Sequence, residues 1–134
     1  MGKGQTMTIL ALRTDKPEAE LYLYEDSQKL AESKWQAHRR LAETIHQKIV
    51  VILQGRALQE VEGVVVFKGP GSFTGLRIGM SAANALVYSL DIPIVSAAGE
   101  EWLKEGIKRL ENGDNERIAV PDYGRPAHTT QPKK

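Results

Sequence analysis

The strongest structural signal in this chain is a glycine-rich turn that joins a short apolar strand to a long apolar helix. Residues 61–67 are mostly apolar and include three consecutive valines, which is typical of a parallel strand covered on both faces. The turn follows at residues 69–75, and small or apolar residues continue to about residue 90. Gly75 and Gly79 are four residues apart, so one helix face carries no side chains and lets another backbone approach. The segment predicts a strand–turn–helix unit of an α/β fold.

The hydrophobic period changes along the chain and sets the order of the elements. Short apolar or alternating runs precede residue 36, and apolar residues then recur at helical spacing. The expected strands are residues 8–14, 19–25, 28–35, 61–67 and 92–95, and the expected helices are residues 36–53, 74–90 and 99–110. An antiparallel meander followed by right-handed crossovers gives the order β-β-β-α-β-α-β-α. This order predicts a single ribonuclease-H-like α/β lobe, of the type found in actin and sugar kinases, with a mixed five-stranded sheet.

Length and composition limit the domain count and the class of partner. The 134 residues are enough for one domain, and we expect a disordered leader at residues 1–6, the lobe at residues 7–111, and a loop and C-terminal tail at residues 112–134. The chain has no cysteine, which excludes disulfides and thiolate metal sites. The formal net charge of +1 disfavours direct nucleic-acid binding as the main task. No apolar run is long enough to span a membrane and the start lacks a secretory signal, so we expect a cytoplasmic protein.

The turn has two possible chemical roles. Ser72 or Thr74 can cap the following helix by accepting a hydrogen bond from a free backbone N–H. The same helix start offers N–H groups to an anion, with Arg77 as a nearby cation. The turn is not a Walker A loop, because the G-x-x-x-x-G-K-[ST] spacing and its lysine are missing. Packing and phosphate binding both remain open, and the alternative function is an anion- or nucleotide-binding domain with Gly69–Gly75 as the phosphate cradle.

The histidines and acidic residues form no pattern typical of a catalytic or metal site. His38 and His46 lie eight residues apart on one expected helix, roughly 12 Å along its axis, too far apart to share a metal ion. The zinc motif H-E-x-x-H is missing, and Ser72 lacks the G-x-S-x-G context of a nucleophile elbow. We therefore predict no catalytic residue, no metal site and no cofactor.

The eleven-residue string G-P-G-S-F-T-G-L-R-I-G at residues 69–79 closely resembles the TsaB family, also called YeaZ. The segment at residues 90–95, the opening strand at residues 9–12, His38 and the Pro-x-Tyr-Gly-Arg at residues 121–125 agree with that family in order. The resemblance implies a part in making threonylcarbamoyladenosine, a modified base of tRNA. It also implies a non-catalytic partner of the catalytic subunit TsaD, with tRNA contacted only indirectly through the complex. The family-motif residues are Gly69, Pro70, Gly71, Ser72, Phe73, Thr74, Gly75 and Arg77.

Two features depart from the family pattern. Full-length members have a second lobe of the same fold, and we expect that lobe to be missing here. The first strand of the family usually ends in Asp-Thr, whereas this chain has Arg13-Thr14. In the wider actin-and-kinase group that acid helps to hold a metal-bound nucleotide, and an arginine cannot act as a metal ligand. Both departures predict that the chain contributes surface rather than nucleotide chemistry.

The first and second helices are apolar on more than one side, which suggests burial on two sides. One possibility is that they pack only on each other and on the sheet. The other is that they pair with a TsaD-type subunit, or with a second copy of the chain, in which case Met80→Glu should weaken pairing and leave the fold intact. The candidate interface residues are His38, Leu41, Ile45, Ile49, Ile52, Leu76, Gly79, Met80, Ala83 and Val87.

Overall fold

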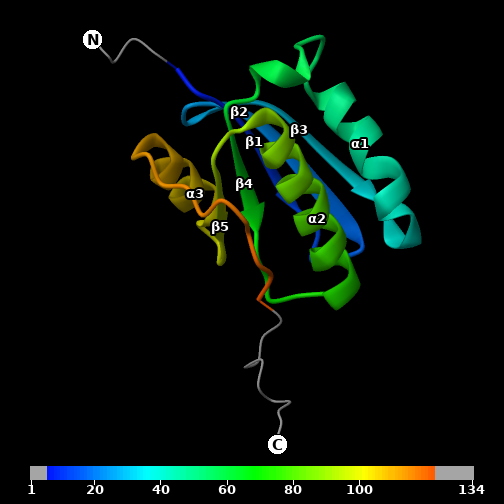
Figure 1. Ribbon diagram of the computed structural model, residues 1–134. Coiled ribbons are helices and arrows are strands. Elements are labelled where there is room, and N and C mark those ends of the chain that lie inside the picture. Colours follow the sequence, from blue (N-terminus) through cyan, green and yellow to red (C-terminus); the bar gives the residue numbers. More distant parts are fainter. Residues whose placement is uncertain (1–5, 123–134) are drawn as a thin grey trace, which may run out of the picture.

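Strand β1 (Thr8–Arg13) lies at the centre of the sheet in the computed structural model, which describes residues 6–122 (Figure 1). It pairs antiparallel with β2 (Glu18–Glu25), which in turn pairs antiparallel with β3 (Gln28–Gln36). On its other side β1 pairs parallel with β4 (Gly63–Phe67), and β4 pairs parallel with β5 (Ile94–Ala97). The five strands have the order β3-β2-β1-β4-β5. The predicted mixed sheet and the predicted order of elements are confirmed.

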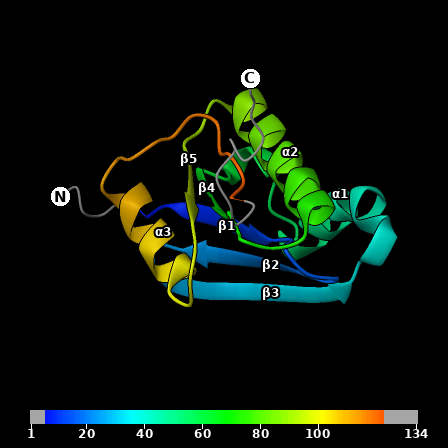
Figure 2. The same ribbon diagram turned by 90° about the horizontal axis from the view of Figure 1, so that it is seen from below.

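Two helices cover one face of the sheet and the third covers the other face (Figure 2). Helices α1 (Leu41–Ile52) and α2 (Phe73–Leu90) pack on the first face, and α3 (Trp102–Glu111) packs on the second. Side chains along β1 alternate between the two cores because successive residues of a strand point to opposite faces. The same alternation divides the valines of β4, which explains why this strand is apolar throughout.

The first helix begins later than the sequence predicts. Residues from 36 were expected to be helical, but Gln36 still belongs to β3 and a 3-10 turn at His38–Arg40 precedes α1. The Ala37 N–H donates a hydrogen bond to the carbonyl oxygen of Pro17 at 2.9 Å. This bond ties the start of the turn to the loop after β1, so the chain bends before the α-helix begins.

Helix α3 lies close to the sheet because one of its core-facing residues is a glycine. A Cβ atom added at Gly106 would lie 2.3 Å from Val65 Cγ1. At the other end of this contact, Trp102 packs edge-on against Phe67 and Tyr22, with ring centroids 5.6 and 6.1 Å apart. Such edge-to-face pairs stabilise the second core beyond simple area burial.

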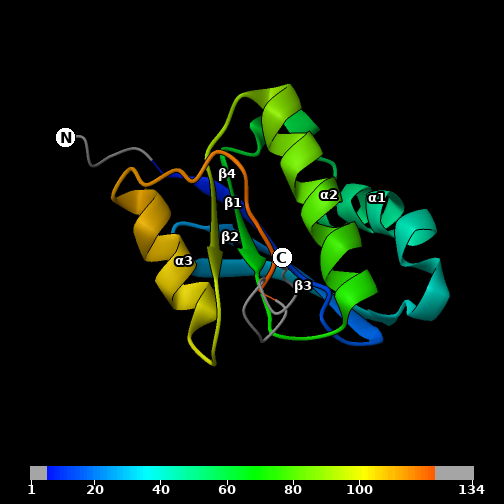
Figure 3. The ribbon, with the colours of Figure 1, turned by 60° about the horizontal axis from the view of Figure 1, so that its bottom comes forward.

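Residues 112–122, which we call the return segment, pass from α3 along β5 toward the end of β4 (Figure 3). The Glu116 carboxylate accepts hydrogen bonds from Ser96 N–H and Oγ and from Arg109. Further along, the Asn84 side chain donates to the carbonyl oxygen of Ala119 at 3.0 Å and accepts its N–H at 2.8 Å. The first part of the expected tail therefore docks on its own lobe.

The outer edge of β5 is closed by this arrangement. The Ile94 N–H donates to Asn115 Oδ1 at 3.1 Å, and the Ile94 carbonyl oxygen accepts the Glu116 N–H at 2.8 Å. The carbonyl oxygen of Ser96 accepts a hydrogen bond from Arg109 Nη1 at 2.8 Å. Side chains and the return segment thus take the place of a neighbouring strand. Within residues 6–122, no helix is both long and apolar enough to cross a membrane.

Candidate functional site

Ser72 is the N-cap of α2. Its Oγ accepts a hydrogen bond from the Gly75 N–H at 3.3 Å, and its carbonyl oxygen accepts the Leu76 N–H at 2.9 Å. Of the two residues that the sequence offered as a cap, Ser72 makes this contact and Thr74 is exposed on the first turn. The Ser72 hydroxyl therefore has a local structural partner.

Three glycines allow the loop after β1 to lie directly against α2. A Cβ at Gly75 would lie 2.2 Å from the carbonyl oxygen of Thr14, and a Cβ at Gly79 would lie 2.1 Å from Thr14 Oγ1. A Cβ at Gly71 would lie 2.3 Å from the Cβ of Asp15. The Thr14 hydroxyl donates to the carbonyl oxygen of Gly75 at 2.8 Å. The close approach predicted from the glycine spacing is confirmed, and the approaching segment is Thr14–Asp15.

The same loop forms a hydrogen bond with a backbone N–H that a phosphate cradle would need to leave free. The Ser72 N–H donates to the carbonyl oxygen of Asp15 at 2.9 Å. The Asp15 side chain is buried beside the turn, and its negative charge disfavours a second anion there. The geometry favours packing over phosphate binding as the role of the turn.

The return segment closes over the turn from the other side. Gly69 has a φ of +108°, and a Cβ there would lie 2.3 Å from the carbonyl oxygen of Asp122. The Asp122 N–H donates to the carbonyl oxygen of Lys68 at 2.6 Å. Gly69 therefore provides both a left-handed backbone conformation and room for a crossing chain.

Arg13 stands at the strand end where the resembling family carries an acid. Its Nε and Nη2 donate to the Asp15 carboxylate at 2.7 and 3.1 Å, and its guanidinium lies 3.9 Å from the centroid of the Phe67 ring. Burial alone would lower the pKa of Arg13, but the hydrogen bonds and charge of Asp15 outweigh it and raise that pKa above its ordinary value. The side chain is held as a cation in a local ion pair, and it offers no oxygen ligand to a metal.

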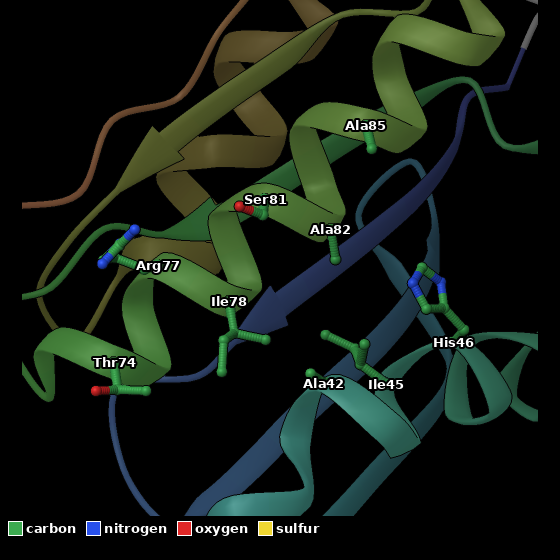
Figure 4. Close-up of a pocket in the computed structure, with 9 residues that line it drawn as sticks. All are labelled: Ala42, Ile45, His46, Thr74, Arg77, Ile78, Ser81, Ala82 and Ala85. Carbon is green, nitrogen blue, oxygen red and sulfur yellow. The ribbon is translucent and has the colours of Figure 1, made fainter.

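A groove of about 400 Å³ lies between α1 and α2 on the outer surface, and we call it the helix groove (Figure 4). Ile78 and Ala82 of α2 point toward Ala42 and Ile45 of α1, whereas the Arg77 side chain points away from α1. The groove is lined by small and apolar residues with few polar groups. The lining residues are Ala42, Ile45, His46, Thr74, Arg77, Ile78, Ser81, Ala82 and Ala85.

The exposed side of α2 is unusually poor in charge. Arg77 is the only charged residue among the 18 residues of the helix. Thr74, Ser81, Ala85 and Tyr88 are nevertheless exposed, Tyr88 to 89%. Helix faces in contact with water usually carry charged side chains, whereas the centres of protein interfaces are depleted of them. The outer face of α2 has the composition of a contact surface.

A second cavity, of about 520 Å³, adjoins the helix groove at the start of α2, and we call it the loop cleft. Thr74 and Ile78 line both cavities, so the two lie next to each other. The loop cleft is bordered by the loop after β1 and by the turn before α1. Its lining residues are Lys16, Pro17, Ala37, Arg39, Leu41, Ser72, Thr74, Gly75 and Ile78.

Nine of the ten candidate interface residues lie in the interior of the lobe rather than on its surface. They are Leu41, Ile45, Ile49, Ile52, Leu76, Gly79, Met80, Ala83 and Val87. They face the sheet because they form the most apolar stripe of each helix, and that stripe covers the strands. Met80 is only 3% exposed, so Met80→Glu would place a carboxylate in the core, and the expectation that it spares the fold is wrong. The solvent-facing side of α1 and α2 borders the helix groove, which Ile45 also lines.

The remaining predicted positions are only partly described. His46 is exposed and lines the helix groove, whereas the side chain of His38 and the whole of Tyr123, Arg125 and His128 lie outside the described part of the chain. Among residues 6–122, no three histidine or acidic side chains lie close enough together to hold a metal ion.

Sequence reasoning did not single out several residues on which this region depends. Thr14 and Asp15 hold the turn, Asn84 holds the return segment, and Ala42 and Ser81 border the helix groove. The paired glycines predicted that another segment approaches α2, but nothing in the local sequence identified that segment as the loop after β1. Thr14 of this loop lies 61 residues before Gly75, the residue to which it is hydrogen-bonded.

The family model described as "TsaD: tRNA N6-adenosine threonylcarbamoyltransferase" matches residues 32–117, well over half of the chain. The chain is 51% identical over 47 residues to the tRNA threonylcarbamoyladenosine biosynthesis protein TsaB of Bacillus subtilis, covering 35% of this chain and 20% of that protein. It is 28% identical over 123 residues to the protein of the same name from Escherichia coli, covering 87% of this chain and 50% of that protein.

Among solved structures, YeaZ from Pseudomonas aeruginosa superposes with a TM-score of 0.65 and 26% identity. The match covers 80% of this chain and 50% of the YeaZ chain. The chain thus spans about half the length of the relatives that it matches over most of its own length. The predicted fold class and the predicted family resemblance are confirmed.

Proposed function

The chain belongs to the TsaD-type family and, within it, to the TsaB (YeaZ) group, and on this basis we propose that it is a non-catalytic partner subunit. The proposed role is to support a TsaD-type enzyme in the threonylcarbamoyladenosine modification of tRNA. In this proposal the chain acts in the cytoplasm and contacts tRNA only through the complex.

The observation that carries the proposal is the helix groove with the charge-poor face of α2. Ala42, Ala82 and Ala85 have short side chains, so the backbone of a partner helix can approach closely along the groove. Ile78 supplies apolar area to the lining of the groove and points toward α1 (Figure 4). Burial of such area stabilises association by roughly 25 cal/mol per Å², before the cost of lost motion.

The contacts of Arg13 and of the turn support the non-catalytic part of the proposal. Arg13 takes the place of a metal-binding acid and is paired with Asp15 at 2.7 Å. Gly71 and Gly75 lie against Thr14–Asp15, so the space beside these glycines is filled by the protein's own chain. The chemistry of the modification is therefore assigned to the TsaD-type partner.

The test is co-purification of this chain with the TsaD-type enzyme of the same organism, followed by light scattering of the eluted complex. We expect the two chains to elute together. Ala85→Glu introduces a charge on the exposed groove side of α2 without touching the core, and we expect it to weaken the complex about tenfold or more.

The matched control is Lys104→Glu, an exposed helical position on α3, which covers the opposite face of the sheet. Circular dichroism should show both variants to be folded. Equal binding by wild type and Ala85→Glu would exclude the helix groove as the contact surface. Separate elution of the wild-type chain and the enzyme at micromolar concentration would contradict the partner role itself.

A further inference from the structure

We propose that the return segment detaches from the lobe as one unit, and that two copies of this chain exchange it. The proposal goes beyond the partner role and does not depend on it. Its basis is the way in which residues 112–122 are attached, together with the left-handed turn by which they leave α3. Figure 3 shows the segment between β5 and α2, and its hydrogen bonds hold it at both elements.

Hydrogen bonds, rather than apolar burial, hold the return segment on the lobe. Of residues 112–122, all of which the structure describes, only Ala119 is buried. Its larger neighbours Ile118 and Val120 are 67% and 65% exposed. Segments with few buried apolar contacts open at a lower free energy than the core of a domain. The return segment is therefore expected to open while the sheet stays intact.

The hydrogen bonds to β5 come from two neighbouring residues, so they break together when the segment leaves. The Glu116 carboxylate accepts the Ser96 N–H at 2.9 Å, the Ser96 Oγ–H at 2.8 Å and Arg109 Nη2 at 2.8 Å. Asn115 Oδ1 accepts the Ile94 N–H at 3.1 Å. Without these residues the backbone of Ile94 and Ser96 is an unpaired strand edge, which accepts another extended chain.

The segment also carries backbone strain where it leaves β5 and turns toward α2. Arg117 has a φ of +70°, a left-handed conformation that is unfavourable for a residue with a side chain. Its N–H is held in place by Asn115 Oδ1 at 2.8 Å. Detachment releases this strain and so favours the open form.

The turn at Gly113 is the hinge from which the segment opens. Gly113 has a φ of +87°, and a Cβ added there would meet no atom within 4 Å. The turn is closed by a bond from the Gly113 N–H to the carbonyl oxygen of Leu110 and by one from Asp114 to Arg109, both at 2.9 Å. Backbone conformation, and not side-chain packing at Gly113, therefore directs the segment back onto its own lobe.

The return segment of a second copy fits the site that the first one leaves, because the two segments have the same sequence. It brings the same Glu116 to β5 and the same Ala119 to Asn84, so every contact of the closed monomer is reproduced. An unrelated strand would not supply the carboxylate or the backbone spacing of these bonds. Exchange of an identical element is a low-cost route to a two-fold dimer.

The test measures the association of hinge variants by sedimentation over a range of micromolar concentrations. Gly113→Val should raise the dimer association constant about tenfold or more, because valine disfavours the left-handed turn and tolerates an extended hinge. Gly113→Ala should shift association in the same direction, and it replaces the valine variant if circular dichroism shows that variant to be unfolded.

The matched control is Gly99→Val, on the other side of α3. Gly99 has a φ of +84° and, like Gly113, no atom within 4 Å of an added Cβ. Gly99→Val therefore introduces the same kind of strain without changing the hinge, and it should associate like the wild type. If the Gly113 variants dimerise no more than Gly99→Val does, the exchange does not occur.

A mixed dimer of isotope-labelled and unlabelled Gly113→Val chains identifies the interface. We expect an isotope-filtered NOE between the Asn84 side-chain amide of one copy and Ala119 of the other, since this contact becomes intermolecular only on exchange. A dimer without that NOE pairs through another surface or by simple strand addition, and would overturn the proposal.

Hydrogen exchange of the wild-type chain tests the detachment step by itself. The amides of Ile94, Ser96 and Ala119 all bond to the return segment or belong to it, so they should exchange with one common opening free energy. Val65 of β4, which has a strand on each side, should exchange more slowly. Equal protection at Ile94 and Val65 would contradict a separate opening. None of these results bears on the proposed partner role.

Discussion

Replacement of Gly79 by alanine tests whether the glycines of the motif exist to admit the loop after β1. The added Cβ would lie 2.1 Å from Thr14 Oγ1, whereas ordinary contacts begin at 3.4 Å, so the two groups must separate by about 1.3 Å. The Thr14 hydroxyl cannot simply turn away at no cost, because it donates a hydrogen bond to the carbonyl oxygen of Gly75.

The magnitude follows from three opposing effects. Overpacking of this kind costs about 1–3 kcal/mol, and loss of the Thr14 hydrogen bond costs about 1 kcal/mol more. Alanine is favoured over glycine within a helix by about 1 kcal/mol, which partly offsets the loss. We expect Gly79→Ala to lower the free energy of unfolding by about 2 kcal/mol, a large share of the 5–15 kcal/mol typical of a domain.

A double-mutant cycle with Thr14→Ala gives the decisive measurement. Thr14→Ala removes the hydroxyl and the methyl group that a Cβ at Gly79 would meet, and leaves the residue-14 Cβ at 3.1 Å. The double variant should therefore be no less stable than Thr14→Ala alone, with a coupling energy of about 2 kcal/mol. Gly75→Ala is the matched control, because its Cβ would meet the backbone oxygen of Thr14 at 2.2 Å, which Thr14→Ala does not remove.

Equilibrium unfolding in urea, followed by circular dichroism, measures all of these variants. A neutral or stabilising effect of Gly79→Ala would refute the proposed role of the glycines, since helix propensity alone would then account for the result. Rescue of Gly75→Ala as well as Gly79→Ala by Thr14→Ala would also refute it, because the loop would then move away as a whole and the specific contacts would not matter.

Two further predictions concern the return segment and the ion pair. Asn84→Ala should lower the free energy of unfolding by about 2 kcal/mol, because both hydrogen bonds to the Ala119 backbone are lost. It should also lower the protection of the amides of residues 115–122 against hydrogen exchange. Unchanged protection would mean that Asn84 does not hold the return segment. Arg13→Met should destabilise the chain by about 3 kcal/mol near pH 7 by leaving the buried Asp15 carboxylate unpaired. A urea midpoint equal to that of the wild-type chain would refute the reasoning.

Most of the fold could be predicted because the elements have clear hydrophobic periods. Strand β2 is an example, because its alternating residues put Leu21 and Leu23 in one core and Tyr22 in the other. Element boundaries were less accurate where tertiary hydrogen bonds decide them. The bond from Ala37 to Pro17, which delays the first α-helix, joins two residues that the pairing of β2 with β3 brings together.

The candidate interface was harder to predict, because an apolar stripe does not say what covers it. The residues with the strongest apolar signal on α2, such as Leu76 and Met80, are the ones that the sheet buries. Alanines such as Ala82 and Ala85 fit equally well inside a core or on a contact surface, so their exposure became clear only in three dimensions. The strand-end position of Arg13 was readable from sequence, whereas its pairing with Asp15 depended on the loop conformation.

The closed edge of β5 has a consequence for the behaviour of the lobe at high concentration. Exposed strand edges template sheet-to-sheet aggregation, and Ile94 and Ser96 have no backbone group left over to accept a new strand on that side. At the opposite edge, β3 carries Lys29, Glu32 and Lys34, whose charges repel incoming strands. Both edges of the sheet are therefore protected against edge-to-edge pairing with another chain.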